Sequence, residues 1–282
     1  MSHSVRPTAG LRRIAAILGA LTLTLAVASC GTSGSPVDAP GASRPAAPGT
    51  GPSAAPSTSA VPGSDLPQGS EPVSLDPADF TTDITNPYWP MTPGSVWEYI
   101  ETNTEGTREK VTVTVTTKTK KIANGITARV IRDEVRDNGQ LTEATDDWYA
   151  QDQSGNIWYL GEATVEYENG KMSTTLGSWE AGVDGAQPGI AMPANPVAGM
   201  AYRQEYLAGV AEDKSAVATV GLEQVEVPFG FFDKDVLMTR DLVPTEPKVQ
   251  ELKFYAPGVG LVLSVHLDGT GGRAELIKYT KG

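Results

Sequence analysis

The stretch DDWYAQDQSGNIWYLGE, residues 146–162, contains two runs of alternating side chains around a glycine-containing turn. Alternation with period two is typical of a β-strand, and Gly155 suits the left-handed position of a three-residue hairpin loop, 153–155. The register that follows pairs Ala150 with Trp158, Trp148 with Leu160, and Tyr149 with Tyr159. The tryptophan face is wholly apolar, so we expect it in the core. The tyrosine face is amphipathic, which leaves open a partly covered surface or a sugar-stacking platform.

The same alternation recurs along the rest of the chain, for example in KVTVTVTTKT, residues 110–119. Asn-Gly and Gly-Gly turn signals separate about ten or eleven such runs. No window has the period of a long amphipathic helix. Residues 76–282 are therefore predicted to form a single all-β domain, an antiparallel meander that forms a curved half-barrel or a closed barrel.

The amino-terminal residues have the layout of an export signal, with arginines followed by an apolar run of fifteen residues, 14–28. The end of that run, Val27-Ala28-Ser29-Cys30, resembles a bacterial lipobox. The resemblance implies removal of residues 1–29, acylation of Cys30, and a lipid anchor on the extracytoplasmic face of the cell membrane. An ordinary secretory signal with an incidental cysteine is the alternative. Cys30 is the only cysteine of the chain, so no disulfide is expected.

Residues 30–75 begin with this cysteine and continue as a predicted tether. Pro, Gly and Ser make up 25 of the 45 residues from 31 to 75, and none of the 45 is aromatic. A segment without bulky apolar side chains cannot offset the entropy lost on ordering, so we expect disorder. The composition resembles tethers of lipoproteins from high-GC Gram-positive bacteria, which implies an actinobacterial source.

Charge and residue types exclude several function classes. The chain carries a net charge of −12, and loss of the three arginines in the leader would take it to −15. Nucleic acid is therefore not an expected partner. After cleavage one histidine remains, His266, predicted to face solvent or a rim, so a catalytic triad and zinc, copper or haem sites are not expected. The sequence predicts no metal and no cofactor, although a calcium site built from distant residues stays open.

The longest irregular segment, residues 177–199, is rich in Gly and Pro and also contains bulky apolar side chains. Loops of this length inside a compact domain are usually functional, so we predict a lid folded over the sheet. Arg203 and Glu205 follow it on one predicted strand face, either as a surface ion pair or as the polar rim of a pocket under the lid. The candidate ligand-binding residues are Trp179, Glu180, Asp184, Arg203, Glu205, Glu212 and Asp213.

Three stretches resemble known exported proteins. NPYWPMTPGSVWEYIET at 86–102 is similar to the opening strand of many uncharacterised bacterial exported proteins, and VEVPFGFFDKDVLMTRD with KFYAPGVGLVLSV resembles their closing strands. The middle, GSWEAGVDGAQPGIAMPANP, resembles a narrower family of bacterial lipoproteins. The wider group is similar to folds with a curved antiparallel sheet, such as the lipoprotein carrier LolA and the lipocalins. This resemblance implies a concave sheet that holds an apolar ligand.

Taken together, these features predict a membrane-anchored, non-catalytic binding module of the cell envelope, whose ligand is apolar or lipidic or whose partner is a protein. The alternative is a carboxylate-based enzyme acting on envelope glycans, which needs a suitably spaced pair of acids. Trp158→Ala is expected to destabilise the domain, whereas Trp179→Ala in the lid is expected to weaken binding and leave melting almost unchanged.

Overall fold

The structure is a computed structural model that describes residues 65–103, 106–267 and 272–282. The predicted leader, Cys30 and most of the predicted tether lie outside the described residues. We find no helix in the described ranges that is long and apolar enough to span a bilayer.

Apart from one short 3-10 turn, Pro77–Asp79, the regular structure in the described ranges is β. The strands are β1 (Phe80–Thr81), β2 (Val96–Thr102), β3 (Arg108–Lys121), β4 (Thr127–Asp137), β5 (Gln140–Asp152), β6 (Ile157–Glu168), β7 (Lys171–Thr174), β8 (Trp179–Glu180), β9 (Gln187–Met192), β10 (Ala201–Arg203), β11 (Glu205–Tyr206), β12 (Lys214–Val220), β13 (Val225–Val227), β14 (Gly230–Phe232), β15 (Leu237–Leu242), β16 (Gln250–Ala256), β17 (Gly260–His266) and β18 (Arg273–Thr280). Several are only two or three residues long, too short for an alternation pattern to reveal, so the sequence predicts fewer strands.

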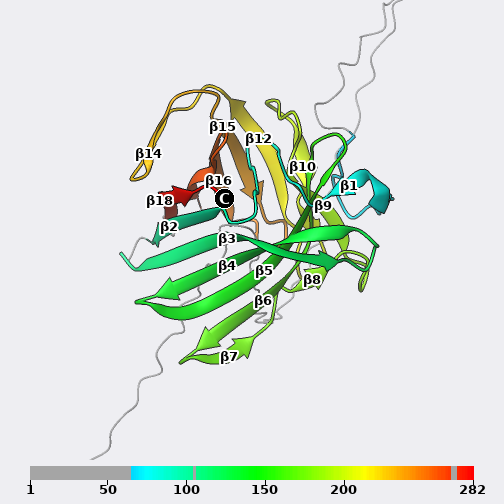
Figure 1. Cartoon of the computed structure of the whole chain (residues 1–282), viewed down its shortest axis with the longest axis horizontal. Coiled ribbons are helices and arrows are strands. Elements are labelled where there is room, and N and C mark those ends of the chain that lie inside the picture. The colour runs from blue at the N-terminus through cyan, green and yellow to red at the C-terminus, as the bar shows by residue number, and fades with distance from the viewer. Residues whose placement is uncertain (1–64, 104–105, 268–271) are drawn as a thin grey trace, which may run out of the picture. The chain divides into compact units, whose positions relative to one another are not determined.

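One antiparallel sheet contains most of these strands, in the order β10-β12-β15-β16-β17-β18-β2-β3-β4-β5-β6-β9-β11. The two ends of this path, β10 and β11, are consecutive in the chain, and β9 contacts β10. The sheet is therefore nearly closed and barrel-shaped, which confirms the predicted fold class. In Figure 1, β12 and β15 rise above the crossing strands β3 to β6, so that the two halves of the sheet face each other.

The β5–β6 hairpin has the predicted loop. The Gly155 amide donates to the Asp152 carbonyl oxygen at 3.0 Å, and the Asp152 amide donates to the Asn156 carbonyl oxygen at 3.0 Å. Gly155 has a φ of 95°, a value that favours glycine. The loop thus contains residues 153–155, as expected. The predicted pairs Ala150–Trp158 and Tyr149–Tyr159 are both confirmed.

The third predicted pair, Trp148 with Leu160, is wrong because a register shift lies between Asp147 and Tyr149. The shift accompanies a close approach of β8 to β6 at Gly161. This residue has a φ of 130°, and a Cβ atom here would lie 2.4 Å from the Trp179 carbonyl oxygen. Alternation alone gave no sign of this bulge.

Both faces of the hairpin are buried, which differs from the expected amphipathic tyrosine face. Tyr149 and Tyr159 stack with ring centroids 4.8 Å apart on the inner face of the sheet. Trp158 is buried, as predicted, but it lies on the opposite face, where Phe80 covers it at a centroid distance of 6.2 Å. The curved sheet encloses one face of the hairpin, and the chain that precedes β2 covers part of the other.

The segment 177–199 does not form the expected lid loop. It contributes β8 and β9, which both pair with β6, so part of it belongs to the sheet itself. Trp179 is 4% exposed, and its ring meets Tyr159 edge-on at 5.3 Å. The many glycine and proline residues hid these short strands, because such residues weaken any strand pattern.

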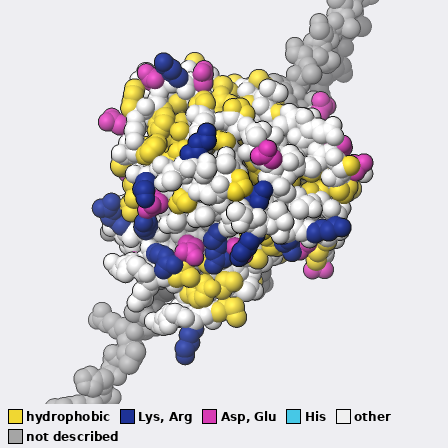
Figure 2. All heavy atoms as spheres, in the orientation of Figure 1, with side chains coloured by type: hydrophobic (Ala, Val, Ile, Leu, Met, Phe, Trp, Pro, Cys, Tyr) yellow, Lys and Arg dark blue, Asp and Glu magenta, His cyan; other side chains and the backbone are white. Residues whose placement is uncertain are grey.

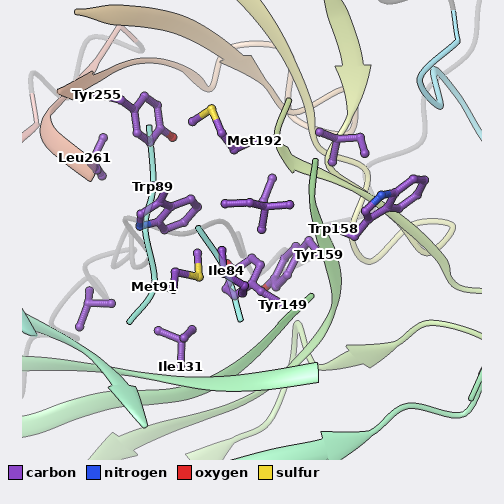
Figure 3. Packing of buried hydrophobic residues seen from close by; sticks show 14 of the residues in the cluster. Ile84, Trp89, Met91, Ile131, Tyr149, Trp158, Tyr159, Met192, Tyr255 and Leu261 are labelled. Atoms are coloured by element: carbon purple, nitrogen blue, oxygen red, sulfur yellow. The ribbon is translucent and has the colours of Figure 1, made fainter. Parts of the chain in front are cut away.

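One end of the sheet's interior is filled by apolar side chains. The segment between β1 and β2 folds inward, with a bridge between Ile84 and Met91. Trp89 packs between two aromatic residues of the sheet, Tyr149 at 5.6 Å and Tyr255 at 6.1 Å (Figure 3). This packing forms the apolar core at this end of the interior.

The outer surface of β2 to β6 is charged, with basic and acidic side chains interspersed (Figure 2). Cross-strand ion pairs include Lys110 with Glu98 at 2.5 Å and Arg132 with Asp146 at 3.1 Å. Exposed pairs of this kind contribute little to stability. These ion pairs balance acidic side chains with basic ones on this face, although the whole chain is acidic.

Candidate functional site

The rest of the interior is polar. Residues paired directly across strands share a face of the sheet, so rows of pairs show what that face carries. The first wall is built by β12 and β15–β18, with β2 and β10 at its two sides. Its rows are Glu101, Ala274, Ser264, Lys253, Thr239 and Val217, then His266, Glu251, Asp241, Ser215 and Tyr202. On the wall built by β2–β6, they are Trp97, Val113, Asp133, Thr145 and Thr164, then Val115, Ile131, Asp147 and Glu162. Carboxyl groups thus line both walls of the interior.

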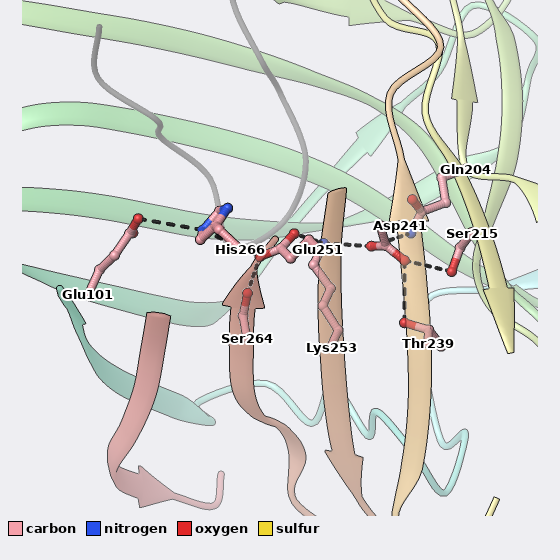
Figure 4. Close-up of polar contacts among 9 residues, drawn as sticks. All are labelled: Glu101, Gln204, Ser215, Thr239, Asp241, Glu251, Lys253, Ser264 and His266. Carbon is pink, nitrogen blue, oxygen red and sulfur yellow. Dashed lines mark hydrogen bonds and ion pairs between the residues drawn. The ribbon is translucent and has the colours of Figure 1, made fainter. Parts of the chain in front are cut away.

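The first wall contains its own cation. The Lys253 amino group lies 2.9 Å from Asp241 Oδ2 and 3.2 Å from Glu251 Oε2 (Figure 4). The Ser215 hydroxyl donates to Asp241 Oδ1 at 2.6 Å. Burial lowers the pKa of Lys253, but Asp241 and Glu251 outweigh that effect and raise it well above the usual range. Lys253 therefore stays charged and compensates these acids.

His266 lies at the end of the same wall. Its side chain is only 9% exposed, and Nε2 lies 3.9 Å from Glu101 Oε1 and 3.7 Å from Glu251 Oε1. The side chain is thus largely covered by Glu101 of β2 and Glu251 of β16 and does not face solvent, while the residue itself stands at the end of β17. Its Nδ1 atom has no hydrogen-bonding partner among the described residues.

Asp147 and Glu162 of the second wall and Glu205 of the nearby strand β11 form a cluster of three acids, which we call the acid cluster. Asp147 and Glu162 are direct cross-strand partners. Glu205 comes from β11, which contacts β6, and its charge adds to the effect of burial in raising the pKa of Glu162. All three side chains are at least 98% buried.

Hydrogen bonds satisfy only part of the acid cluster. The Tyr159 hydroxyl donates to Asp147 Oδ1 at 2.7 Å, and the Thr164 hydroxyl donates to Glu162 Oε2 at 3.0 Å. The other oxygens, Asp147 Oδ2 and Glu162 Oε1, are buried without a partner in the described part of the chain, as is Glu205 Oε2. Trp179 Nε1 is a buried donor whose hydrogen bond lowers the pKa of Glu205. Buried polar atoms are normally satisfied, so the unpaired oxygens of Asp147 and Glu162 point to an interaction with a further group.

Burial also changes the acidity of these groups. It raises the pKa of Asp147 to about 7 and raises that of Glu162 and Glu205 well above the usual range. The same cause raises the pKa of Glu101 and Glu143, each to about 8. The buried carboxyl groups are therefore partly protonated near neutral pH, and a nearby charged group would change how many of them are ionised.

The structure brings together three of the seven candidate site residues. Trp179 packs against Tyr159, which itself donates to Asp147, and Glu205 belongs to the acid cluster. Asp213 lies close to Glu205, since the Gln204 amide donates to the Asp213 carbonyl oxygen at 2.8 Å. Burial raises the pKa of Asp213 to about 7.

The other four candidates lie elsewhere. Arg203 is buried and donates to the carbonyl oxygens of Pro188 and Glu71, so it is neither an ion pair with Glu205 nor a rim residue. Glu180 pairs with Lys120 at 2.9 Å. Asp184 is exposed in a turn with a φ of 51°. Glu212 accepts a hydrogen bond from the Gly209 amide at 2.8 Å.

Sequence reasoning missed Asp147, Glu162 and Lys253. Each stands in a strand at an alternating position, and a charged residue at such a position usually indicates a solvent face. One signal was present: Asp147 shares its face with Tyr149, so the face is not simply polar. Among the described residues, no group of three His, Cys, Asp or Glu side chains is arranged to hold a metal ion.

The described chain is thus a nearly closed antiparallel sheet with a carboxylate-lined interior. No protein-family model and no curated protein matches the chain. Among solved structures it is similar to a provisionally named lipoprotein from Parabacteroides distasonis, with 13% identity and a TM-score of 0.37, over 68% of this chain and 98% of that one. At that TM-score the likeness carries no argument, so the resemblance to bacterial lipoproteins, LolA and the lipocalins stays a prediction.

Proposed function

We propose that this chain is a lipid-anchored, non-catalytic binding protein of the bacterial cell envelope, and that its ligand is polar and lies at the carboxylate-lined part of the sheet's interior. The observation that carries the proposal is the unpaired, buried oxygen on both Asp147 and Glu162 of the acid cluster. Leaving such atoms without a partner costs about 1–3 kcal/mol each, and a bound ligand would remove that cost.

The packing of the interior supports a polar ligand over an apolar one. Trp89, Met91 and Ile84 already fill the apolar end, together with the aromatic residues of the sheet. An apolar ligand would have to displace these side chains, whereas a polar ligand would meet oxygens that lack partners. A protein partner on the outer surface is compatible with the same architecture.

The anchoring rests on the sequence around Cys30. We expect Cys30→Ser to move the protein from the detergent phase to the aqueous phase in a phase-partition assay, because acyl chains add about 0.8 kcal/mol of membrane affinity per buried methylene. Wild-type protein found wholly in the aqueous phase would refute the anchor and leave the binding site untouched.

Thermal melts of the full chain with four probes test the binding function. The probes are palmitate, a neutral disaccharide, the diamine cadaverine and calcium. A polar probe should raise the melting temperature, and the effect should disappear in Glu162→Gln but persist in Glu134→Gln, an outer-face acid that pairs with Arg136. A shift with palmitate alone, or no shift with any probe, would overturn the proposal.

The alternative enzyme has one observation in its favour, since a carboxyl group with a pKa near 7 suits a general acid. Release of sugar from envelope glycan by the wild type, lost in Asp147→Asn and retained in Glu134→Gln, would replace binding with catalysis as the function.

A further inference from the structure

We infer that the acid cluster of Asp147, Glu162 and Glu205, beside the rings of Tyr159 and Trp179, binds the protonated amino group of a small organic amine. This inference rests on the proposed binding function and names the class of its ligand. It starts from a contrast between the two walls of the interior.

The first wall shows how this interior holds an ammonium group. Lys253 Nζ lies within 3.2 Å of two carboxylate oxygens, one from β15 and one from β16, and its side chain is 6% exposed. The second wall offers carboxyl groups from neighbouring elements in the same way, but no ion pair forms to the acid cluster within the described ranges. The charges of Lys253 and Arg132 lower the pKa of Glu205 and Asp147, but neither cation forms an ion pair with the acid cluster.

Charge repulsion within the acid cluster supports a cationic occupant. Acids placed directly opposite each other on neighbouring strands repel, and Asp147 and Glu162 occupy such positions with Glu205 close by. A single positive group among these acids would be attracted to each carboxylate, and this attraction would offset the repulsion between them. The unpaired oxygens are acceptors when ionised, which matches a donor-only ammonium group.

Aromatic rings narrow the class from cations in general to organic amines. Tyr159 stacks on Tyr149, meets Trp179 edge-on at 5.3 Å and donates its hydroxyl to Asp147. Aromatic rings beside a charged site shield the alkyl part of an amine from water. Metal ions such as calcium are surrounded instead by oxygen ligands.

Binding should displace protons. The acid cluster is packed among other titratable groups: Asp133 and Arg132 from β4, Glu143 and Asp146 from β5, Tyr149 and Tyr159 from β5 and β6, Asp213, and Lys253 from β16. Burial keeps part of the acid cluster protonated near neutral pH, and a cation favours the ionised form. Affinity for an amine should therefore rise as the pH rises, with release of protons on binding.

Isothermal titration calorimetry of the full chain in detergent tests the inference, with cadaverine as the probe and pentanediol, its uncharged analogue, as the control ligand. Near pH 7 we expect cadaverine to bind, pentanediol not to bind, and two buffers of different ionisation enthalpy to reveal proton release. Glu162→Gln and Glu205→Gln should each weaken binding by about tenfold or more. Glu134→Gln should leave affinity unchanged.

Two results would overturn the inference and leave the binding function standing. In the first, pentanediol or calcium binds in place of cadaverine, and Glu162→Gln weakens that binding. In the second, cadaverine binds, but neither Glu162→Gln nor Glu205→Gln weakens its binding. If no polar probe binds and native mass spectrometry of the purified chain shows no small molecule, the inference and the proposed function both fail. Melting temperatures of both variants establish that a loss of binding is not a loss of fold.

Discussion

At the scale of single residues, Lys253 and the two acids around it form a buried charge network on the inner face of the sheet. Removing a buried charge costs far more than removing an exposed one, because the partners left behind are desolvated and uncompensated. This chain contains a matched exposed case in Lys278, whose amino group lies 2.9 Å from Glu98 and whose side chain is 62% exposed.

We therefore expect Lys253→Ala to lower the free energy of unfolding by about 3–5 kcal/mol. Lys278→Ala should change it by less than about 1 kcal/mol. Urea unfolding of both variants makes the comparison. Equal effects of the two substitutions would mean that Asp241 and Glu251 are stabilised without Lys253.

Residue identities could be predicted only in part. Trp179 was predicted because it lies in the long irregular segment 177–199, and Glu205 and Asp213 because they follow that segment. Asp147 and Glu162 were not predicted. A polar residue in an alternating strand indicates a solvent face, and the sequence does not show that the curved sheet buries this face as well.

At the scale of elements, β8 lies against β6 and is held close by Gly161. Gly161→Ala should cost several kcal/mol, since both its φ of 130° and the contact with the Trp179 carbonyl oxygen oppose a side chain. Gly139→Ala is the matched control: its φ is 81°, no atom lies within 4 Å of the added Cβ, and only about 1–2 kcal/mol of backbone strain is expected. Guanidinium unfolding distinguishes them, and similar costs would contradict the close approach.

The same contact revises what is expected of the two tryptophans. Both Trp158 and Trp179 are buried, so truncation to alanine should cost about 3–5 kcal/mol in either case. Phe231→Ala serves as control, because Phe231 is 57% exposed and its loss should change stability by about 0.5 kcal/mol or less. Thermal melts measure all three. A Trp179→Ala variant that melts like the wild type would return the segment to the lid expected from sequence.

Long elements could be predicted from sequence, and short ones could not. The β5–β6 hairpin has enough alternating residues to reveal its loop and two of its pairs. β8 and β11 have two residues each, so tertiary contacts decide their conformation. The near closure of the sheet depends on these short strands, which is why half-barrel and barrel were both open.

At the scale of the whole molecule, the buried acids link stability to pH. Burial raises the pKa of Glu101 and Glu143 to about 8 and that of Asp147 to about 7, so the folded state binds more protons than the unfolded state between roughly pH 4.5 and 8. Their contribution is fully present below that window and is lost as the pH rises through it. Glu98, whose pKa Lys110 lowers, acts in the opposite direction at lower pH.

We expect the free energy of unfolding to fall between pH 5 and 8, with a slope of up to about 1.4 kcal/mol per pH unit for each buried acid. Chemical unfolding at several pH values measures the slope, and Glu143→Gln should make it shallower. A stability that rises with pH across this range would show that these acids are ionised in the folded protein.

The shortness of β10 and β11 also bears on how readily copies of this protein aggregate at high local concentration. Fibril growth needs an exposed strand edge onto which another chain can add its backbone, and long flat edges are the usual templates. The sheet path of this protein ends in strands of three and two residues that follow each other in the chain. Crowded copies would thus find little backbone on which to polymerise at these two ends of the sheet path.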